Sequence, residues 1–329
     1  MANTKVLGTG MYVPPRVLTN NDLEKMMDTS DEWIRQRTGI SERHVVEPGV
    51  GPSDLAVEAA RQAVDNAGIS LDDIDFIVFA TLSPDHYFPG SGVLVQDKLG
   101  LDTVGALDIR QQCTGFIYGM AVTDQFIKTG MYKHILLIGA EVQSVGLDWN
   151  TEGRDIACLF GDGAGAVVCG PTEDEGVISS HLHCQGKHAD KLWTEMPSTR
   201  HKPILSAEDM AQRRHVPQME GRYVFKHAIR RFGESINEAL EANSVTVADV
   251  DLFVFHQANL RITEMVCGML DIPMDKTFNT IHKYGNTTAA SIPICLHEAV
   301  ESGKLNRGDL VCLVAFGSGF TWGSVLLRW

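Results

Sequence analysis

Apolar residues in this chain gather in short continuous runs rather than in strict alternation. Residues 104–109 and 134–139 form two such runs, and residues 310–315 form a third. Alternation is typical of a strand with one solvent face, whereas a short continuous run indicates a strand that is covered on both faces. The pattern therefore predicts an α/β structure in which helices cover the sheets.

Two stretches of the sequence resemble each other where an acidic turn enters an apolar strand. DDIDFIVFA at residues 72–80 matches ADVDLFVFH at residues 248–256, an offset of 176 residues. The same offset places the apolar run at 134–139 on the run at 310–315. Matches that recur in the same order favour a duplicated α/β unit over chance similarity between apolar strands.

Cys113 lies where a predicted strand ends and a predicted helix begins. The run at 104–109 precedes it, and Phe116, Met120 and Ile127 follow on one helical face. Free backbone N–H groups and the positive end of the helix dipole meet at such a position, and both favour a thiolate over a thiol. Cys113 is therefore a candidate nucleophile, and a buried, inert cysteine is the alternative.

The expected halves, residues 1–173 and 174–329, place further candidates near Cys113. The repeat offset carries Cys113 to a position three residues after Asn286. Packing about a pseudo-twofold axis would make the two helix starts face each other and bring Asn286 close. His256 ends a neighbouring strand, and strand ends are where α/β sheets place their sites. Taken singly, His256 is better explained as a structural histidine and Asn286 as a turn residue.

The composition narrows the class of protein. Of 329 residues, 44% are hydrophobic and 21% are charged, which is typical of globular proteins. A formal net charge of −14 argues against general nucleic-acid binding, and no apolar stretch is long enough to cross a bilayer. The first residues lack the layout of a signal peptide, and seven cysteines without paired spacing fit a reduced compartment. We therefore expect a cytoplasmic protein that binds neither nucleic acid nor membrane.

Two motifs suggest ligand sites that the surrounding sequence does not support. The glycine-rich residues 161–165 continue into an apolar strand, where a dinucleotide-binding fingerprint requires a helix. We interpret them as tight backbone packing, with Asp162 bonding loop amides. HLHC at residues 181–184 has no second cluster of metal ligands at suitable spacing, so we expect a strand or loop and no metal site.

Six motifs together give the chain a specific resemblance to a known family. In order they are DEWI with RTGI (31–40), LDIRQQCTGFIYGM (107–120), FGDGAGA (160–166), FHQANLRI (255–262), KYGNT (283–287) and FGSGFTWG (316–323). On these motifs the chain resembles β-ketoacyl-acyl-carrier-protein synthase III, in the thiolase-like superfamily. The resemblance implies a thiolase-like fold, in which two duplicated α/β halves lie about a pseudo-twofold axis in five layers, αβαβα.

The resemblance implies a catalytic site made of Cys113, His256 and Asn286. Cys113 would take an acyl group from acyl-CoA, and the backbone N–H groups of Cys113 and Ser318 would stabilise the oxyanion. Malonyl-acyl-carrier protein would then lose CO₂, while neutral His256 and the Asn286 amide donate to the enolate oxygen. Attack of the enolate carbon on the acyl-cysteine would give a β-ketoacyl thioester. No cofactor is implied beyond these substrates.

Further positions resemble family residues that contact coenzyme A or a second protomer. Trp33 resembles the aromatic residue that stacks on the adenine of coenzyme A, with Arg37 and Arg154 as its charged neighbours. Phe88 resembles a residue that crosses a homodimer interface and touches the partner's acyl pocket. From hydrophobicity alone, Trp33 would be half-buried core and Phe88 would be core.

A basic segment offers a surface for an acidic carrier protein. Residues 200–231 hold eight Lys or Arg and three Asp or Glu, a local charge of +5. Lys226 and Arg230 lie four residues apart on the polar side of a predicted helix, and Arg261 resembles a docking residue of the family. Opposite charge would steer an acyl carrier protein to this surface. A solvated helix face without a partner is the alternative.

Departures from the family pattern leave several questions open. Gln111 and Gln112 stand where small residues are common, Ser318 replaces a glycine, and residues 181–221 are longer and more polar than usual. The donor chain length, the acceptor and the pathway stay open, so a specialised acyltransferase or condensing enzyme of secondary metabolism is the alternative. The order Cys, His, Asn also suits a papain-like hydrolase, and a non-catalytic carrier-binding protein is a third alternative.

Overall fold

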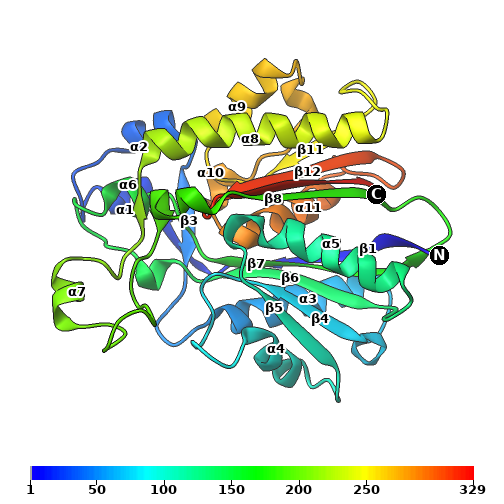
Figure 1. The fold of residues 1–329 in the computed structure, drawn as a ribbon, viewed down its shortest axis with the longest axis horizontal. Helices are drawn as coiled ribbons and strands as arrows, with labels where there is room; N and C mark the ends of the chain where they lie inside the picture. The colour runs from blue at the N-terminus through cyan, green and yellow to red at the C-terminus, as the bar shows by residue number, and fades with distance from the viewer. Residues whose placement is uncertain (1) are drawn as a thin grey trace.

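Two β-sheets form the frame of the computed structural model, which describes residues 2–329 (Figure 1). The first sheet has the order β1 (Asn3–Tyr12), β7 (Gly163–Thr172), β6 (Ile135–Glu141), β4 (Phe76–Ala80) and β5 (Gly105–Ile109). The second has the order β11 (Leu252–Phe255), β12 (Leu310–Gly317), β13 (Thr321–Arg328) and β8 (Val177–Cys184). Pairing is parallel between β4 and its neighbours β5 and β6 and between β11 and β12, and antiparallel elsewhere in both sheets.

Helices fill the space between the sheets and cover their outer faces. Two lie between the sheets and contact strands of both: α5 (Gly115–Lys128) and α11 (Ser291–Glu301). The outer face of the first sheet carries α3 (Pro52–Ala67) and α4 (Ser91–Leu99), and that of the second carries α8 (Gly221–Ala242) and α9 (Leu260–Met269) (Figure 1). The layers follow the order αβαβα, which confirms the expected thiolase-like fold.

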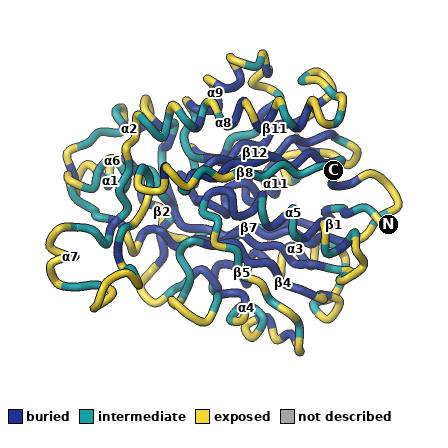
Figure 2. Tube along the Cα trace, viewed as in Figure 1, coloured by how far each residue is buried: buried dark blue, intermediate teal, exposed yellow. Residues whose placement is uncertain are grey.

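The central strands are buried on both faces, as their continuous apolar runs predict. The prediction is wrong for the run at 104–109, because β5 lies at the edge of its sheet and all its residues are exposed or half-buried. All seven residues of β6 and all eight of β12 are buried. In Figure 2 the sheets and the two central helices form the dark interior of the molecule. Apolar side chains stabilise this interior by leaving water, and a polar group such as Glu141 at the end of β6 needs hydrogen-bond partners there.

The sequence repeat corresponds to matching elements. The offset of 176 residues carries β4 onto β11, η2 (Gln112–Thr114) onto η6 (Thr288–Ala290), α5 onto α11, and β6 onto β12. Gln112 and Thr288, which the offset pairs, share a left-handed backbone with φ of 47° and 46°. The duplicated architecture is therefore confirmed. The boundary that we propose after residue 173 falls in the turn between β7 and β8.

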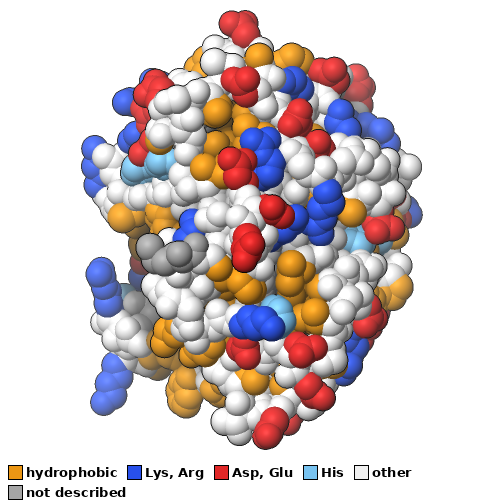
Figure 3. Space-filling model, turned by 90° about the vertical axis from the view of Figure 1, so that its right-hand side faces the viewer, with side chains coloured by type: hydrophobic (Ala, Val, Ile, Leu, Met, Phe, Trp, Pro, Cys, Tyr) orange, Lys and Arg blue, Asp and Glu red, His pale blue; other side chains and the backbone are white. Residues whose placement is uncertain are grey.

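Shorter elements gather at the end of the molecule opposite the two termini (Figure 1). They are β2 (Arg16–Thr19), α1 (Asn20–Leu23), α2 (Asp31–Thr38), β3 (Glu42–Val45), α6 (Arg154–Ala157), η4 (Gly186–Lys191), β9 (Leu192–Trp193), α7 (Ala207–Ala211), β10 (Gln218–Met219) and α10 (Ile281–Tyr284). Single turns elsewhere are η1 (Leu71–Asp73), η3 (Ser144–Gly146) and η5 (Met274–Lys276). On the face that carries both termini, acidic and basic side chains are interspersed (Figure 3).

The two doubtful motifs have structural roles. β7 begins at Gly163, so the glycine-rich stretch enters a strand, as expected. Asp162 accepts the backbone N–H groups of Val46, Gln143 and Ser144 at 2.7–2.9 Å, together with the Ser144 hydroxyl. The HLHC segment lies in β8, and no group of three metal-ligating side chains occurs within residues 2–329.

We predict that Asp162→Asn destabilises the fold. The substitution removes one acceptor oxygen and points an amide N–H group at buried backbone donors. Hydrogen bonds to a charged group contribute about 1.5–3 kcal/mol each, so the free energy of unfolding should fall by about 3 kcal/mol. Urea denaturation measures this change. Asp174→Asn, at an exposed carboxylate, is the matched control and should change stability by less than about 0.5 kcal/mol. Equal stability of the two variants would contradict the role of Asp162.

Candidate active site

Cys113 lies in a tight turn between β5 and α5. Gln112 before it has a φ of 47°, in the left-handed region that side chains rarely adopt. A Cβ on Gly317, the last residue of β12, would lie 2.8 Å from the Cβ of Cys113, so the close approach of these segments requires glycine. Cys113 is 8% exposed. The turn therefore places the sulfur at the junction of the two sheets.

Burial raises the pKa of the Cys113 thiol to about 12. The nearby Glu141 carboxylate raises it as well, whereas the backbone N–H groups of Cys113 and Ser318 lie beside the sulfur and lower it. The helix start alone predicts a thiolate, and the structure corrects that prediction, because lost hydration outweighs the donors. Resting Cys113 is a thiol, so its proton must leave as the sulfur attacks.

His256 follows β11 and is buried, with one ring nitrogen paired. Its Nδ1 lies 2.7 Å from Ser291 Oγ, which accepts the backbone N–H of Gln257 at 3.3 Å. Burial lowers the pKa of the imidazole to about 3, so the ring is neutral. Because Ser291 Oγ accepts from Gln257, its own proton can be donated to Nδ1, which leaves the ring proton on Nε2. Nε2 is buried without a partner among residues 2–329 and is free to donate to a bound oxygen.

Asn286 holds its side-chain amide in a fixed orientation. Its Oδ1 accepts the backbone N–H of Thr288 at 2.9 Å. Its own backbone N–H donates to the carbonyl of Leu159 at 2.8 Å, and its carbonyl accepts the N–H of Gly161 at 3.1 Å. With Oδ1 occupied, Nδ2 is the end of the amide that is free to donate.

Cys113, His256 and Asn286 line a single cavity of about 110 Å³. Its other walls are mainly apolar and include Phe225 and Phe232 from α8. The structure therefore brings together three residues from distant segments, as the repeat and the resemblance predict. The lining, which lies wholly within the described chain, includes no acidic side chain. No side chain on this lining would therefore repel negative charge that develops beside the Asn286 amide and the His256 imidazole.

Cys113 also borders a second, larger cavity of about 350 Å³. Neither His256 nor Asn286 lines it, and its walls carry several polar side chains, including Arg110 and Gln143. Ser318 lines this cavity as well. The residue of this loop with a positive φ, 131°, is Gly319, and Ser318 has no left-handed backbone. The change from glycine to serine is therefore accommodated without strain.

Two guanidinium groups lie over the ring of Trp33, which is half-buried on α2. The central carbons of Arg37 and Arg154 lie 4.4 Å and 5.1 Å from the ring centre. Asn259 donates from Nδ2 to the carbonyl of Arg37 at 2.9 Å, and Asn259 also lines the cavity that contains Cys113. The structure thus brings the three predicted coenzyme A residues together and joins them to the wall of the candidate site.

The three predicted docking residues lie on two adjacent helices. Lys226 and Arg230 are exposed on α8, and Arg261 is exposed at the start of α9. The central guanidinium carbon of Arg261 lies 5.5 Å from the ring centre of Phe225, which lines the smaller cavity, so Arg261 lies at its rim. Arg230 pairs with Glu234 at 2.7 Å, which neutralises part of the charge expected there.

Phe88 is exposed, whereas hydrophobicity alone predicts a core residue. It is 81% exposed and Tyr87 beside it is 65% exposed, both on the loop between β4 and α4. β5 is an edge strand of the first sheet, and Leu107 on it is exposed too. Exposed aromatic side chains and an unpaired strand edge are typical of a protein–protein contact.

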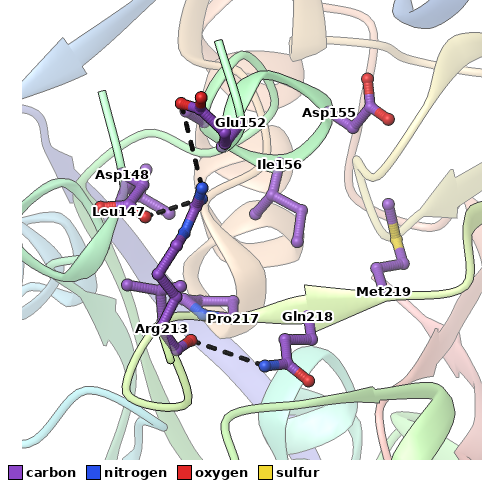
Figure 4. Close-up of a pocket in the computed structure, with 12 residues that line it drawn as sticks. Leu147, Asp148, Glu152, Asp155, Ile156, Arg213, Pro217, Gln218 and Met219 are labelled. Atoms are coloured by element: carbon purple, nitrogen blue, oxygen red, sulfur yellow. Dashed lines mark hydrogen bonds and ion pairs between the residues drawn. The ribbon is translucent and has the colours of Figure 1, made fainter. Parts of the chain in front are cut away.

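The long polar segment at residues 181–221 is tied to the loop that precedes α6. Arg213 pairs with Asp148 at 2.7 Å and reaches Glu152 at 4.0 Å, on the wall of a cavity of about 280 Å³ (Figure 4). None of the three candidate catalytic residues lines that cavity. The segment instead reaches the site through Leu192, which borders both cavities at Cys113.

Two positions around the site could not be identified from the sequence. Ser291 orients the His256 ring, although nothing in a lone serine at a helix start indicates such a partner. Glu141 is buried and accepts the backbone N–H groups of Leu82 and Ser83 at 3.2–3.3 Å. Burial raises the pKa of the Glu141 carboxyl. Both contacts join segments far apart in the chain, so spacing carries no signal for them.

Comparisons with known proteins agree with this architecture. Family models match residues 107–186, described as 3-oxoacyl-(acyl-carrier-protein) synthase III, and residues 240–329, described as its C-terminal part. The β-ketoacyl-(acyl-carrier-protein) synthase III of Thiobacillus denitrificans is 45% identical over 333 residues and is covered in full, as is this chain. Synthase III 1 of Bacillus anthracis is 45% identical over 328 residues, with 99% of each chain covered.

A solved structure supports the same assignment. The crystal structure of 3-oxoacyl-(acyl-carrier-protein) synthase III from Aquifex aeolicus is similar with a TM-score of 0.90 and 43% identity, covering 99% of this chain and 100% of that one. The likeness thus extends over the whole chain, including the segments that carry the candidate catalytic residues. The chain belongs to the β-ketoacyl-(acyl-carrier-protein) synthase III family, whose members are condensing acyltransferases.

Proposed function

We propose that the protein joins an acyl group held on Cys113 to malonyl-acyl-carrier protein. The observation that supports this best is the single cavity shared by Cys113, His256 and Asn286. In the first step, Cys113 Sγ attacks the thioester carbon of acyl-CoA, and coenzyme A leaves as a thiol with the proton that the cysteine loses. The N–H groups of Cys113 and Ser318, which already lie beside the sulfur, would stabilise the oxyanion of the tetrahedral intermediate.

In the second step, the malonyl thioester loses CO₂ and its carbonyl oxygen becomes an enolate oxygen. Nε2–H of His256 and Nδ2 of Asn286 are free to donate on the lining of the smaller cavity, and we assign both to that oxygen. The lowered pKa of His256 keeps the ring neutral, and its single ring proton, on Nε2, is the one donated to the enolate oxygen as a hydrogen bond. The enolate carbon then attacks the acyl carbonyl, and the C–S bond to Cys113 breaks as the β-ketoacyl thioester forms. The Cys113 sulfur leaves as a thiolate and takes a proton from solvent water, which restores the resting thiol.

Coenzyme A and the carrier protein would approach from the rim of the smaller cavity. An adenine ring can stack on Trp33 while Arg37 and Arg154 pair with phosphate groups. Arg261 at the rim, with Lys226 and Arg230 on the adjacent helix, offers positive charge to an acidic carrier protein.

The exposed loop at Phe88 and the edge strand β5 support a homodimer, in which Phe88 would reach the acyl pocket of the second protomer. Within residues 2–329, no helix combines the length and apolarity needed to cross a membrane. We place the enzyme in the cytoplasm because its seven cysteines, without paired spacing, fit a reduced compartment, and we assign it no resident cofactor. Residues 1–173 would supply the nucleophile, and residues 174–329 would supply His256 and Asn286.

We predict that acyl-CoA labels the wild-type protein on Cys113 and that Cys113→Ala abolishes the label. Intact-protein mass spectrometry after exposure to acetyl-CoA measures the added acyl group, and radiolabelled acetyl-CoA measures the same acylation by counting. Cys184→Ala is a matched control, because Cys184 is exposed yet borders neither cavity. Labelling that survives in Cys113→Ala, or that is lost in Cys184→Ala, would remove Cys113 from the mechanism.

We predict that His256→Ala and Asn286→Ala keep the acylation step but stop malonyl decarboxylation. Each change removes one donor to the enolate oxygen, and loss of one such donor typically lowers kcat by roughly 10²–10³-fold. Release of ¹⁴CO₂ from malonyl-acyl-carrier protein reports the second step, and acyl-enzyme mass reports the first. Asn237→Ala, at an exposed asparagine on α8, should behave as wild type. Lost acylation with intact decarboxylation would show that these roles are reversed.

We predict that Arg261→Glu raises KM for malonyl-acyl-carrier protein by about tenfold at low salt and leaves acylation by acyl-CoA unchanged. The difference should shrink as salt rises, because exposed charges are screened within roughly 8–10 Å at 0.10–0.15 M ionic strength. Lys133→Glu makes the same charge change beside Ala2, near the N-terminus, and serves as the control. Unchanged carrier kinetics in Arg261→Glu would contradict docking at this helix.

A further inference from the structure

The two cavities that meet at Cys113 have different linings. The smaller one, with His256 and Asn286, has mainly apolar walls. The larger one presents six polar side chains, from Arg110, Gln112, Gln143, Thr194, Thr288 and Ser318. Its volume of about 350 Å³ lies within the range of small-molecule sites, roughly 300–1,000 Å³.

The acyl group on Cys113 has to extend into the larger cavity during condensation. The acceptor thioester must put its carbonyl oxygen beside His256 and Asn286, so the smaller cavity is then occupied by the acceptor. The attacked acyl carbonyl lies between the two cavities, at the sulfur that borders both. The polar lining of the larger cavity therefore acts on the donor acyl chain. This step rests on the proposed function.

Several polar groups of this lining have no partner within the described chain. Arg110 forms no ion pair or side-chain hydrogen bond with any of residues 2–329, and it is exposed in the protomer. The Thr288 hydroxyl is buried beside the Glu141 carboxylate and forms no well-aligned hydrogen bond within the described residues. Gln143 is 7% exposed and donates from Nε2 to Glu141 at 3.2 Å, while its Oε1 makes no such bond. Replacing the water around such groups with a hydrocarbon chain costs free energy, because their hydrogen bonds to water are lost and not replaced.

We propose that the acyl group carried by Cys113 ends in a carboxylate, as in the monothioester of a short dicarboxylic acid. Arg110 is the one charged side chain on the lining, within the part of the chain that the structure describes, and its charge is positive. A carboxylate would give it a charge-assisted hydrogen bond, which is stronger than a neutral one.

Acylation of Cys113 by four-carbon donors tests this inference. Succinyl-CoA, 3-hydroxybutyryl-CoA and butyryl-CoA share a chain length and differ in their oxygen atoms. Single-turnover rates, read as acyl-enzyme mass, should fall in that order, with succinyl-CoA at least about tenfold faster than butyryl-CoA. Arg110→Met should bring the succinyl rate down to the butyryl rate, and Arg61→Met, at an exposed arginine of α3 that borders neither cavity, should not.

A second variant guards against a merely structural effect. Arg110→Glu should reject succinyl-CoA while accepting β-alanyl-CoA, whose amine is positive, better than the wild type does. Acetyl-CoA tests the proposed function separately, since failure of every acyl-CoA to label Cys113 would refute that function. If acetyl-CoA labels Cys113, two results would overturn the carboxylate assignment alone. One is a butyryl rate equal to or above the succinyl rate, and the other is a succinyl preference that survives in Arg110→Met.

Discussion

The close packing of each helix start against a strand end of the other half is the constraint on which the site depends. A Cβ on Gly139 would lie 2.3 Å from the carbonyl oxygen of Ala289, and a Cβ on Gly317 would lie 2.8 Å from the Cβ of Cys113. Neither position can hold a side chain without moving the backbone of its neighbour. The contact between η2 and η6 brings the nucleophile of one half beside the loop that holds Asn286 in the other.

The same packing sets the protonation states of the site. Water is excluded around Cys113 and His256, and each charged form loses more hydration than the neutral form. A neutral imidazole suits a hydrogen-bond donor, whereas a neutral thiol is a weak nucleophile until its proton leaves. Oxidation of cysteine proceeds through the thiolate, so burial also protects the resting sulfur. Exclusion of water therefore favours the decarboxylation step, which uses the neutral imidazole, and slows the acylation step, which needs the thiolate.

The sequence predicted the architecture well because duplication preserves backbone geometry. Continuous apolar runs located the strands, and the offset located Asn286 near Cys113 without knowledge of any contact. Hydration could not be predicted in the same way, since it depends on how closely distant segments pack, and the predicted sign of the Cys113 pKa shift was wrong for that reason. Hydrophobicity alone also predicted wrongly that Phe88 would lie in the core. Its surroundings depend on what lies outside the protomer, and hydrophobicity does not distinguish a core residue from one at a protein–protein contact.

The paired left-handed residues Gln112 and Thr288 carry information about the duplication. This backbone conformation is unfavourable for both side chains. It persists at Thr288 although Ala289 after it has no nucleophile to present. Its recurrence at the repeat offset of 176 residues shows that the duplication preserves the corner even where it presents no nucleophile. In the second copy the corner presents no reactive side chain, and the loop before it contributes Asn286 to the cavity at Cys113.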